Sequence, residues 1–225
     1  MAPRRYRMDT RAAAVEQTRQ RIVEATVALH REEGVLATSW EDIAKRADVA
    51  LGTVYRHFPS RDALVKACGK EVSAIIQPAK PEDAERIFAN TSSLEARIGL
   101  LIDELFAFYE RGSAFIELQL REGQQVPGLA ASSARRDAGR DSLVREALRD
   151  VRANEQTVHV VSVLTDFPVW KSLEVRGVEK ETAAATMKAL LLAYLTKARR
   201  TKNVALSTKK VSRKEPDRSP HYSRT

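Results

Sequence analysis

The sequence predicts an all-α fold of about nine helices. Apolar residues recur at spacings of three and four along most of the chain, whereas the alternating pattern of strands is scarce. Gly34 and Pro59 stand where helical segments are expected to end. The 225 residues are 43% hydrophobic, which is enough for one large domain or two small ones with a sizeable core.

Capping and breaking residues set the expected order of the helices. Thr38 and Ser39 offer N-cap oxygens for the second helix. Asp48 marks the turn after it, because Asp tolerates a left-handed backbone better than most residues. Pro168 predicts a kink within the eighth helix. We expect helices at residues 18–33, 40–47, 50–58, 60–76, 94–111, 114–123, 131–151, 157–175 and 180–198, with a loop and one helical turn near 87–89 between the fourth and fifth.

The same pattern divides the chain into four regions. We expect a flexible basic arm at residues 1–17, a unit of short helices at 18–77 and a larger helical unit at 78–198. Residues 199–225 are predicted to be a disordered basic tail, because Lys, Arg, Ser and Thr replace the apolar residues there.

The formal net charge of +8 is distributed unevenly along the chain. Residues 1–70 carry +4, residues 71–196 carry −4 and residues 197–225 carry +8. The basic first region suggests a nucleic-acid partner, although a charge of this size alone is weak support.

Several protein classes are excluded by what the sequence lacks. Cys68 is the only cysteine, so an intrachain disulfide framework and a multi-cysteine metal site are ruled out. Nucleotide-binding, metalloprotease and hydrolase motifs are absent, and we expect no enzyme activity, no cofactor and no metal. The longest strictly apolar runs hold about seven residues, and no apolar stretch follows the basic N-terminus, so we expect a cytoplasmic protein.

Residues 38–64 predict two short helices joined by a tight turn, which is a helix-turn-helix. Ile43 and Ala44 are placed to pack back onto the first helix, and the small Ala47 lets the two short helices approach closely. Val54 and Phe58, four residues apart, form the buried side of the second short helix. Its outer surface is then left with hydroxyl, Arg and His side chains, which are suited to phosphates and base edges.

This stretch resembles the N-terminal domain of the tetracycline-repressor (TetR) family. Three positions depart from the family pattern, since Asp48 stands at the usual turn glycine, Ala50 at the usual N-cap serine and His30 where an aromatic is common near the end of the first helix. The spacing is otherwise kept. The matching residues are Thr38, Ser39, Ile43, Ala44, Ala47, Val49, Gly52, Thr53, Val54, Tyr55, His57, Phe58, Ser60, Arg61 and Leu64.

The resemblance implies a set of phosphate contacts. Thr53, Tyr55 and His57 are expected to contact phosphates or the neighbouring bases. Arg61 occupies the basic position that clamps a backbone phosphate at the start of the fourth helix. The amides that follow Ser39, at the N-terminus of the second helix, can also hold a phosphate.

Base reading is expected from residues that vary within the family. These are Ala50, Leu51 and Arg56, of which Leu51 can contact a thymine methyl and Arg56 can read guanine. Lys45 supplies background positive charge. The predicted partner of this surface is double-stranded operator DNA.

Aromatic side chains spread over the middle helices leave two interpretations open. Ordinary core packing explains most of them, and an apolar ligand cavity between helices is the functional alternative. A histidine in an apolar stretch is more often a core residue than a ligand, and the glutamates at 104, 117 and 122 fit a solvated face better than a site for a cationic ligand. The candidate pocket residues are Phe106, Tyr109, Phe115, His159, Phe167 and Trp170.

The last two expected helices, at residues 157–175 and 180–198, are predicted to form a homodimer. The final helix carries a wider apolar stripe than one core-facing side needs, and the family resemblance implies a four-helix bundle between two subunits. The candidate interface residues are Ala184, Met187, Leu191, Tyr194 and Leu195.

The resemblance implies a ligand-responsive transcriptional regulator. Residues 18–77 would be its DNA-binding domain and residues 78–198 its ligand-binding and dimerisation domain. Repression is the expected mode, with release from the operator caused by an apolar or amphipathic small molecule. The alternative is an architectural DNA-binding protein that uses the basic tail and has no effector.

Overall fold

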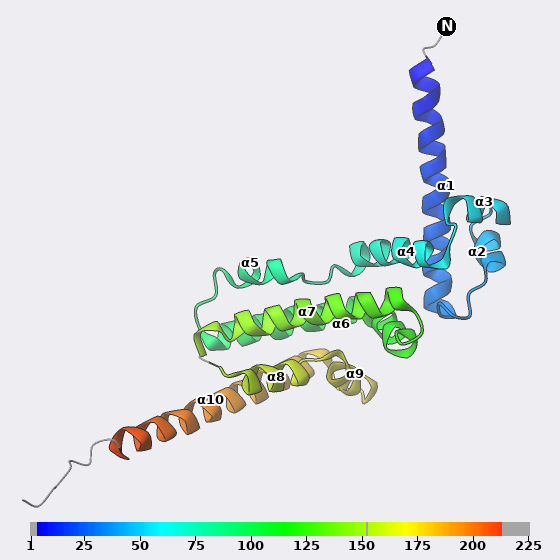
Figure 1. The fold of residues 1–225 in the computed structure, drawn as a ribbon. Coiled ribbons are helices and arrows are strands. Elements are labelled where there is room, and N and C mark those ends of the chain that lie inside the picture. Colours follow the sequence, from blue (N-terminus) through cyan, green and yellow to red (C-terminus); the bar gives the residue numbers. More distant parts are fainter. Residues whose placement is uncertain (1–3, 152, 213–225) are drawn as a thin grey trace, which may run out of the picture.

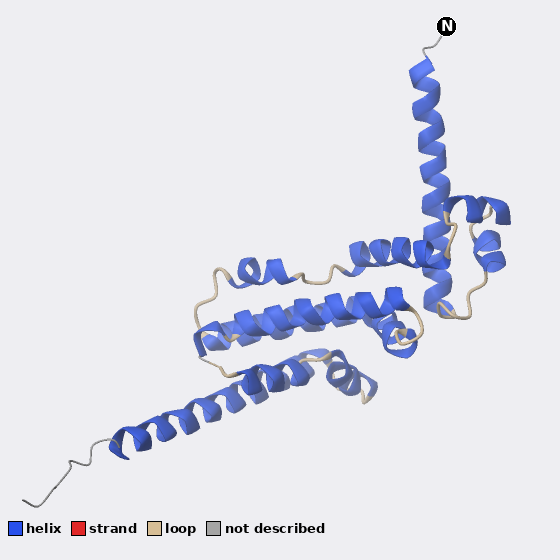
Figure 2. Ribbon diagram, viewed as in Figure 1, coloured by secondary structure: helices blue, strands red, loops and turns tan. Residues whose placement is uncertain are grey.

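The computed structural model describes the backbone of residues 4–151 and 153–212 and the side chains of residues 11–151 and 153–197. The part of the chain so described is helical and contains no strand (Figure 2). The α-helices are α1 Arg4–Glu32, α2 Trp40–Arg46, α3 Leu51–His57, α4 Arg61–Ile76, α5 Ala84–Phe88, α6 Leu94–Glu122, α7 Pro127–Ala147, α8 Glu155–Leu164, α9 Phe167–Val175 and α10 Lys180–Ser212, and 3-10 turns lie at Pro81–Asp83 and Arg149–Val151.

The helices form a small head and a larger bundle (Figure 1). Helices α2 and α3 pack beside the C-terminal half of α1, and α4 runs from this head along the bundle. In the bundle α6 and α7 lie side by side, with α10 and the short α8 and α9 on the far side from α4. Each part has its own buried apolar cluster, one built on α1 to α4 and one on α4 to α10.

A third, smaller apolar cluster joins the head to the bundle. Val35 from the α1–α2 loop and Val65 from α4 meet Leu118 from α6 and Val126, the residue just before α7. All four side chains are less than 9% exposed. The head is therefore packed against the ends of α6 and α7 rather than attached through α4 alone.

The first helix is much longer than the sequence pattern predicted. It begins at Arg4, whereas we expected an irregular arm as far as residue 17. Neither Gly nor Pro interrupts residues 4–32, and the segment contains three consecutive alanines, which favour helix strongly. Residues 11–17 are all exposed, so helix propensity and not burial supports this part of the extension.

One expected helix break is absent and another is stronger than expected. Residues 94–122 form one unbroken helix, because Gly112 tolerates a helical backbone and allows Ile116 and Ile76 to pack closely over it. At Pro168, where we expected a kink within one helix, the chain instead ends α8 at Leu164 and begins α9 at Phe167. The Asp166 carboxylate accepts the Phe167 N–H at 2.8 Å and caps α9.

The last helix continues past residue 198, where we expected it to end. Helix α10 runs to Ser212, so residues 199–212 are helical in place of the predicted disordered tail. No Pro or Gly occurs between Lys180 and Ser212, and Lys, Arg, Ala and Leu all favour helix. The remainder of the predicted tail, residues 213–225, lies outside the described residues.

Candidate nucleic-acid interface and internal cavity

The helix-turn-helix has the geometry that the sequence predicted. Ser39 caps α2 by accepting the Asp42 N–H at 3.1 Å. Asp48 adopts a left-handed backbone with φ of 51° and makes the turn into α3. Val54 and Phe58 are 0% and 2% exposed on the inner side of α3. The Ala50 departure has the expected effect, since α3 begins without a side-chain cap.

The candidate DNA-contacting residues come from α2, α3 and the start of α4. Tyr55 is 45% exposed, and its ring lies 5.0 Å from that of Trp40, so the two aromatic rings support each other at the surface. Lys45, Ala50, Arg56 and Arg61 are exposed, and Ser39, Leu51, Thr53 and His57 are half-buried. Their individual contacts with DNA stay predictions.

Arg61 has a second role that the sequence did not indicate. Its guanidinium donates to the carbonyl oxygens of Thr38 at 3.1 Å and of Val35 at 3.4 Å. The Thr38 hydroxyl in turn donates to the Gly34 carbonyl at 2.6 Å. Arg61 therefore fixes the loop between α1 and α2, in addition to any contact with a phosphate.

Glu122 at the end of α6 holds the same loop from the bundle side. Its Oε2 accepts the backbone N–H groups of Val35 at 2.8 Å and Leu36 at 3.1 Å, while Arg121 donates to its Oε1 at 3.0 Å. The residue is 6% exposed, so our assignment of Glu122 to a solvated face was wrong. The signal was its position four residues after the buried Leu118, on the inner face of α6.

His30 lies next to this carboxylate and is 7% exposed. Burial lowers the pKa of His30 from 6.5 to about 4, although nearby Glu122 raises that pKa and Arg61 lowers it. The imidazole is therefore neutral at physiological pH. The His30 side chain also lines the cavity described in the next paragraph, so His30 lies between that cavity and Glu122.

A cavity of about 790 Å³ lies between α4, α6, α7 and the segment that connects α4 to α5. Two of the six predicted pocket residues, Tyr109 and Phe115, line it. Apolar side chains dominate its α4 and α6 walls. They include Val65, Val72, Ile76, Leu105, Phe108 and Ile116.

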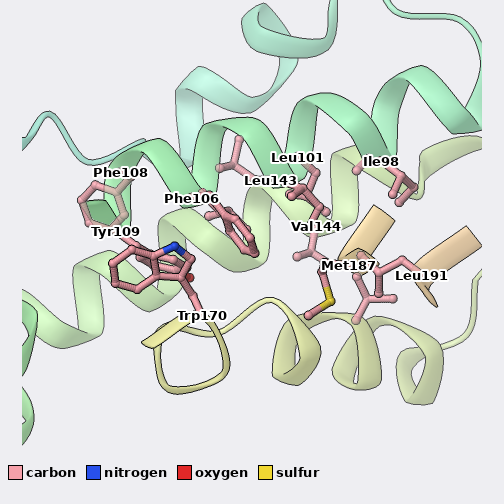
Figure 3. Close-up of a cluster of buried hydrophobic side chains, with 14 of the residues drawn as sticks. Ile98, Leu101, Phe106, Phe108, Tyr109, Leu143, Val144, Trp170, Met187 and Leu191 are labelled. Carbon is pink, nitrogen blue, oxygen red and sulfur yellow. The ribbon is translucent and has the colours of Figure 1, made fainter. Parts of the chain in front are cut away.

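The other predicted pocket residues lie elsewhere. Phe167 and Trp170 are in an aromatic cluster with Tyr109, with ring centroids 5.5 and 5.9 Å from the Tyr109 ring. Figure 3 shows Tyr109 and Trp170 next to each other. Phe106 is buried in the bundle core and does not line the cavity. His159 is 74% exposed on α8, so neither a core nor a pocket position is correct for it. Periodicity identified buried aromatics but could not tell a filled core from a hollow one.

The sequence also failed to point out two arginines of the cavity wall, Arg136 and Arg140 of α7. Their side chains are 10% and 14% exposed. They stand four residues apart and in register with Ser132, which also lines the cavity. This spacing was the available signal for a polar face of α7.

The residues chosen for the dimer interface are mostly core residues of the single chain. Met187, Leu191 and Leu195 are 4%, 0% and 0% exposed, and the first two contact the α6–α7 core (Figure 3). Ala184 and Tyr194 are half-buried against the same core. Packing α10 onto its own bundle uses this stripe, so it is not available to a partner.

Other apolar residues of α8 and α10 are exposed. Leu190 is 54% exposed on α10, and Val163 is 65% exposed on α8. The small residues Ala185, Ala189 and Ala193 are exposed on α10 at spacings of four. These residues, and not the buried stripe, are open to a second copy of the chain.

The helix-turn-helix also matches a family model. Residues 22–68 fit the model described as "Bacterial regulatory proteins, tetR family". The chain is 31% identical over 161 residues to the HTH-type transcriptional repressor KstR of Mycobacterium tuberculosis, covering 71% of this chain and 70% of the relative. The chain belongs to the TetR family. A KstR from Rhodococcus jostii is 30% identical over 179 residues, covering 78% of this chain and 80% of that protein.

Solved structures support the family's fold over most of the chain. The multidrug binding protein EbrR, complexed with imidazole, superposes with a TM-score of 0.52 at 21% identity, covering 79% of this chain and 89% of EbrR. A SmeT–triclosan complex gives a TM-score of 0.56 at 19% identity, covering 79% and 91% of the two chains. Membership of the TetR family makes the chain a helix-turn-helix transcriptional regulator and not an enzyme.

Two further searches of the described residues bear on the site. None of their helices is long and apolar enough to cross a membrane. No group of three or more His, Cys, Asp and Glu side chains among them is gathered closely enough to hold a metal ion.

Proposed function

We propose that this chain represses transcription as a homodimer that leaves its operator when a small molecule fills the cavity. In this proposal, residues 18–77 are the DNA-binding domain and residues 78–198 bind the effector and the second subunit. The separate apolar clusters of head and bundle support that division. Relatives named as transcriptional repressors support the mode of action.

The contact between Glu122 and the α1–α2 loop carries this proposal. The cavity touches α6 at Leu118 and Gln119, within one turn of Glu122. An occupant that displaces the end of α6 moves a carboxylate bonded to the Val35 and Leu36 amides. Because the recognition helix α3 packs in the same head as this loop, a movement of the loop also changes the orientation of α3 relative to the bundle. The effector can shift the equilibrium only by its differential affinity for the two orientations.

The dimer is proposed to use the exposed face of α8 and α10. Leu190, Val163 and the alanines of α10 form an apolar surface on two adjacent helices. A four-helix bundle made from two such pairs would place two α3 helices on one side of the DNA, about one helical turn or somewhat more apart. The operator is then expected to be a two-fold repeat.

Selection of bound fragments from random DNA tests the proposal. The wild-type chain is expected to select a palindromic sequence, and Arg56→Ala to relax the preference at one position of each half-site by about 1–3 kcal/mol. Arg176→Ala, which removes an exposed charge at the end of α9, is the matched control. Selection of no consensus would favour the architectural alternative.

A thermal-shift screen followed by operator release tests the effector. A molecule that binds only the folded chain raises the melting temperature, by RT ln(1 + [L]/Kd) in free energy. Stabilising molecules are expected to release the selected DNA from the wild type. Molecules that stabilise the chain yet never alter DNA binding would contradict an effector role for the cavity.

A further inference from the structure

The walls of the cavity differ in chemistry. The α4 wall is apolar, with Val65, Val72 and Ile76 facing the cavity at helical spacings. The α7 wall adds a polar row to apolar residues such as Leu129 and Leu143, because Ser132, Arg136 and Arg140 follow one another at intervals of four. A molecule that fills both sides therefore needs an apolar body and a polar group on the α7 side.

The side chains of Arg136 and Arg140 are fixed by neighbouring polar residues. Arg136 donates to the Gln119 amide oxygen at 2.7 Å and to Asp137 at 3.1 Å. Arg140 is paired with Asp166 and lies 3.6 Å from the Asp137 carboxylate. None of these aspartates lines the cavity. The guanidinium groups are thus fixed by carboxylates outside the cavity, while Arg136 and Arg140 themselves form part of its wall.

The cavity wall carries more cationic than acidic side chains. An anionic group of a ligand would form charge-assisted hydrogen bonds with guanidinium donors, and such bonds are stronger than those to a neutral acceptor. The cationic residues are Lys80, Arg86, Arg111, Arg135, Arg136 and Arg140, and the acidic residues are Glu82, Asp83 and Glu104.

The acidic residues of the cavity wall do not compensate for these charges. Asp83 is already paired with Arg86 at 3.0 Å and accepts the Lys80 N–H at 3.0 Å. Glu82 and Glu104 are exposed, so water screens their carboxylates. In contrast, the two arginines of α7 are nearly buried, where charge interactions are screened less.

We propose that the cavity takes an amphipathic carboxylate, with its apolar body against α4 and α6 and its acidic group at Arg140 and Arg136. The proposal rests on the cavity being the effector site and specifies the chemical class of the effector. The volume of about 790 Å³ is large enough for a drug-sized or long-chain molecule. A neutral apolar molecule of the same size offers the guanidinium groups of Arg136 and Arg140 no charged acceptor.

Calorimetric titration of the full chain with three matched probes tests the class. Dodecanoate, dodecanol and dodecylammonium share one alkyl chain and differ in head group. Dodecanoate is expected to bind the wild type about 10–100-fold more tightly than dodecanol, the range for one charge-assisted hydrogen bond. Binding of dodecanol or dodecylammonium as tightly as dodecanoate overturns the proposal, and so does failure of all three to bind.

Variants locate the head group. Arg140→Gln and Arg136→Gln are each expected to reduce the preference for dodecanoate over dodecanol about 10-fold or more. Arg145→Gln, an exposed position of α7 outside the cavity, is expected to keep that preference. Binding of dodecanol to each variant reports whether the cavity is still formed. A preference that survives in both cavity variants overturns the assignment.

The same samples separate this inference from the proposed function. Their operator binding is measured with the DNA fragment selected by the wild type. Carboxylate preference without release of DNA supports the anion site and contradicts the effector role. Release of DNA by dodecanol and by dodecanoate at equal concentrations supports the effector role and overturns the anion site.

Discussion

The head and the bundle obtain their functional residues from the chain in different ways. In the head, the candidate DNA contacts lie within residues 39–61, on two short helices and the start of α4, whose short connections fix their relative placement. In the bundle, the cavity draws its wall from α1, α4, α5, α6, α7 and a loop. Local spacing is therefore sufficient to define the first surface, whereas the second exists only after distant helices have packed.

The comparison teaches what an apolar stripe leaves undetermined. Helix α3 has one short apolar side, and the head is the only place where that side can be buried. Helix α10 offers two faces, one with Met187 and Leu191 and the other with Leu190. Periodicity marks both as apolar, but only the packed bundle decides which one faces the core and which one faces outward.

The largest expected effect separates these two faces of α10. Leu191→Glu places a charge at a fully buried position and is expected to lower the free energy of unfolding by at least about 4 kcal/mol. Leu190→Glu alters an exposed position, so it is expected to preserve the fold and dissociate the dimer. Thermal unfolding and sedimentation velocity measure the two outcomes. A Leu190→Glu variant that remains dimeric would refute the proposed interface.

A second effect concerns pH at the junction of head and bundle. His30 has its pKa lowered from 6.5 to about 4 by burial. Between these values the unfolded chain binds a proton that the folded chain does not, so stability falls as the pH falls, by on the order of 3 kcal/mol in total. Above pH 6.5 the group makes no pH-dependent contribution.

Urea unfolding of wild type and His30→Gln across this pH range checks the effect. The wild type is expected to lose more stability than the variant between pH 6.5 and 4, because Gln does not titrate. Parallel curves for the two proteins would show that His30 is not buried as a neutral group.

A smaller effect distinguishes the two roles of Arg61. Arg61→Ala is expected to destabilise the chain by about 1 kcal/mol, through loss of its bonds to the Thr38 and Val35 carbonyls. It should also reduce the salt dependence of operator binding by about one unit per half-site. Lys66→Ala, at an exposed position one turn along α4, is the stability control. Arg61→Lys keeping both stability and salt slope would argue against the loop contacts.

The smallest expected effect restores a missing cap in the head. Ala50→Ser supplies a side-chain oxygen at the N-cap of α3, where none is present and the backbone is already extended. The expected gain in unfolding free energy is about 0.5–2 kcal/mol. Denaturant unfolding measures it, and Ala74→Ser, at an exposed position within α4, is the control for adding a hydroxyl. Destabilisation by Ala50→Ser would mean that the serine side chain cannot reach the amides of the first turn of α3.

The sequence was sufficient for the fold class, the family and the head, because each depends on contiguous residues. Asp48 and Ser39 act at the turn and cap where local rules placed them. The sequence was insufficient to predict the cavity and the loop contacts of Glu122, because both depend on how helices that are distant in sequence pack against one another. The spacing places Glu122 on the same side of α6 as Leu118, but it does not reveal the α1–α2 loop whose amides the carboxylate binds. Helix lengths were underestimated for a different reason, since charge and polarity were taken as disorder where propensity favours helix.

The Glu122 contact also matters for exchange of the two parts of the molecule. Gly34 has φ of +102°, and a Cβ on it would lie 2.2 Å from the Glu122 Oε1. A side chain at position 34 would therefore strain the backbone and have to displace that oxygen, and a bundle without the glutamate would leave the Val35 and Leu36 amides without this acceptor. A DNA-binding domain grafted onto this bundle is therefore expected to fit best when it keeps a glycine at the position of Gly34.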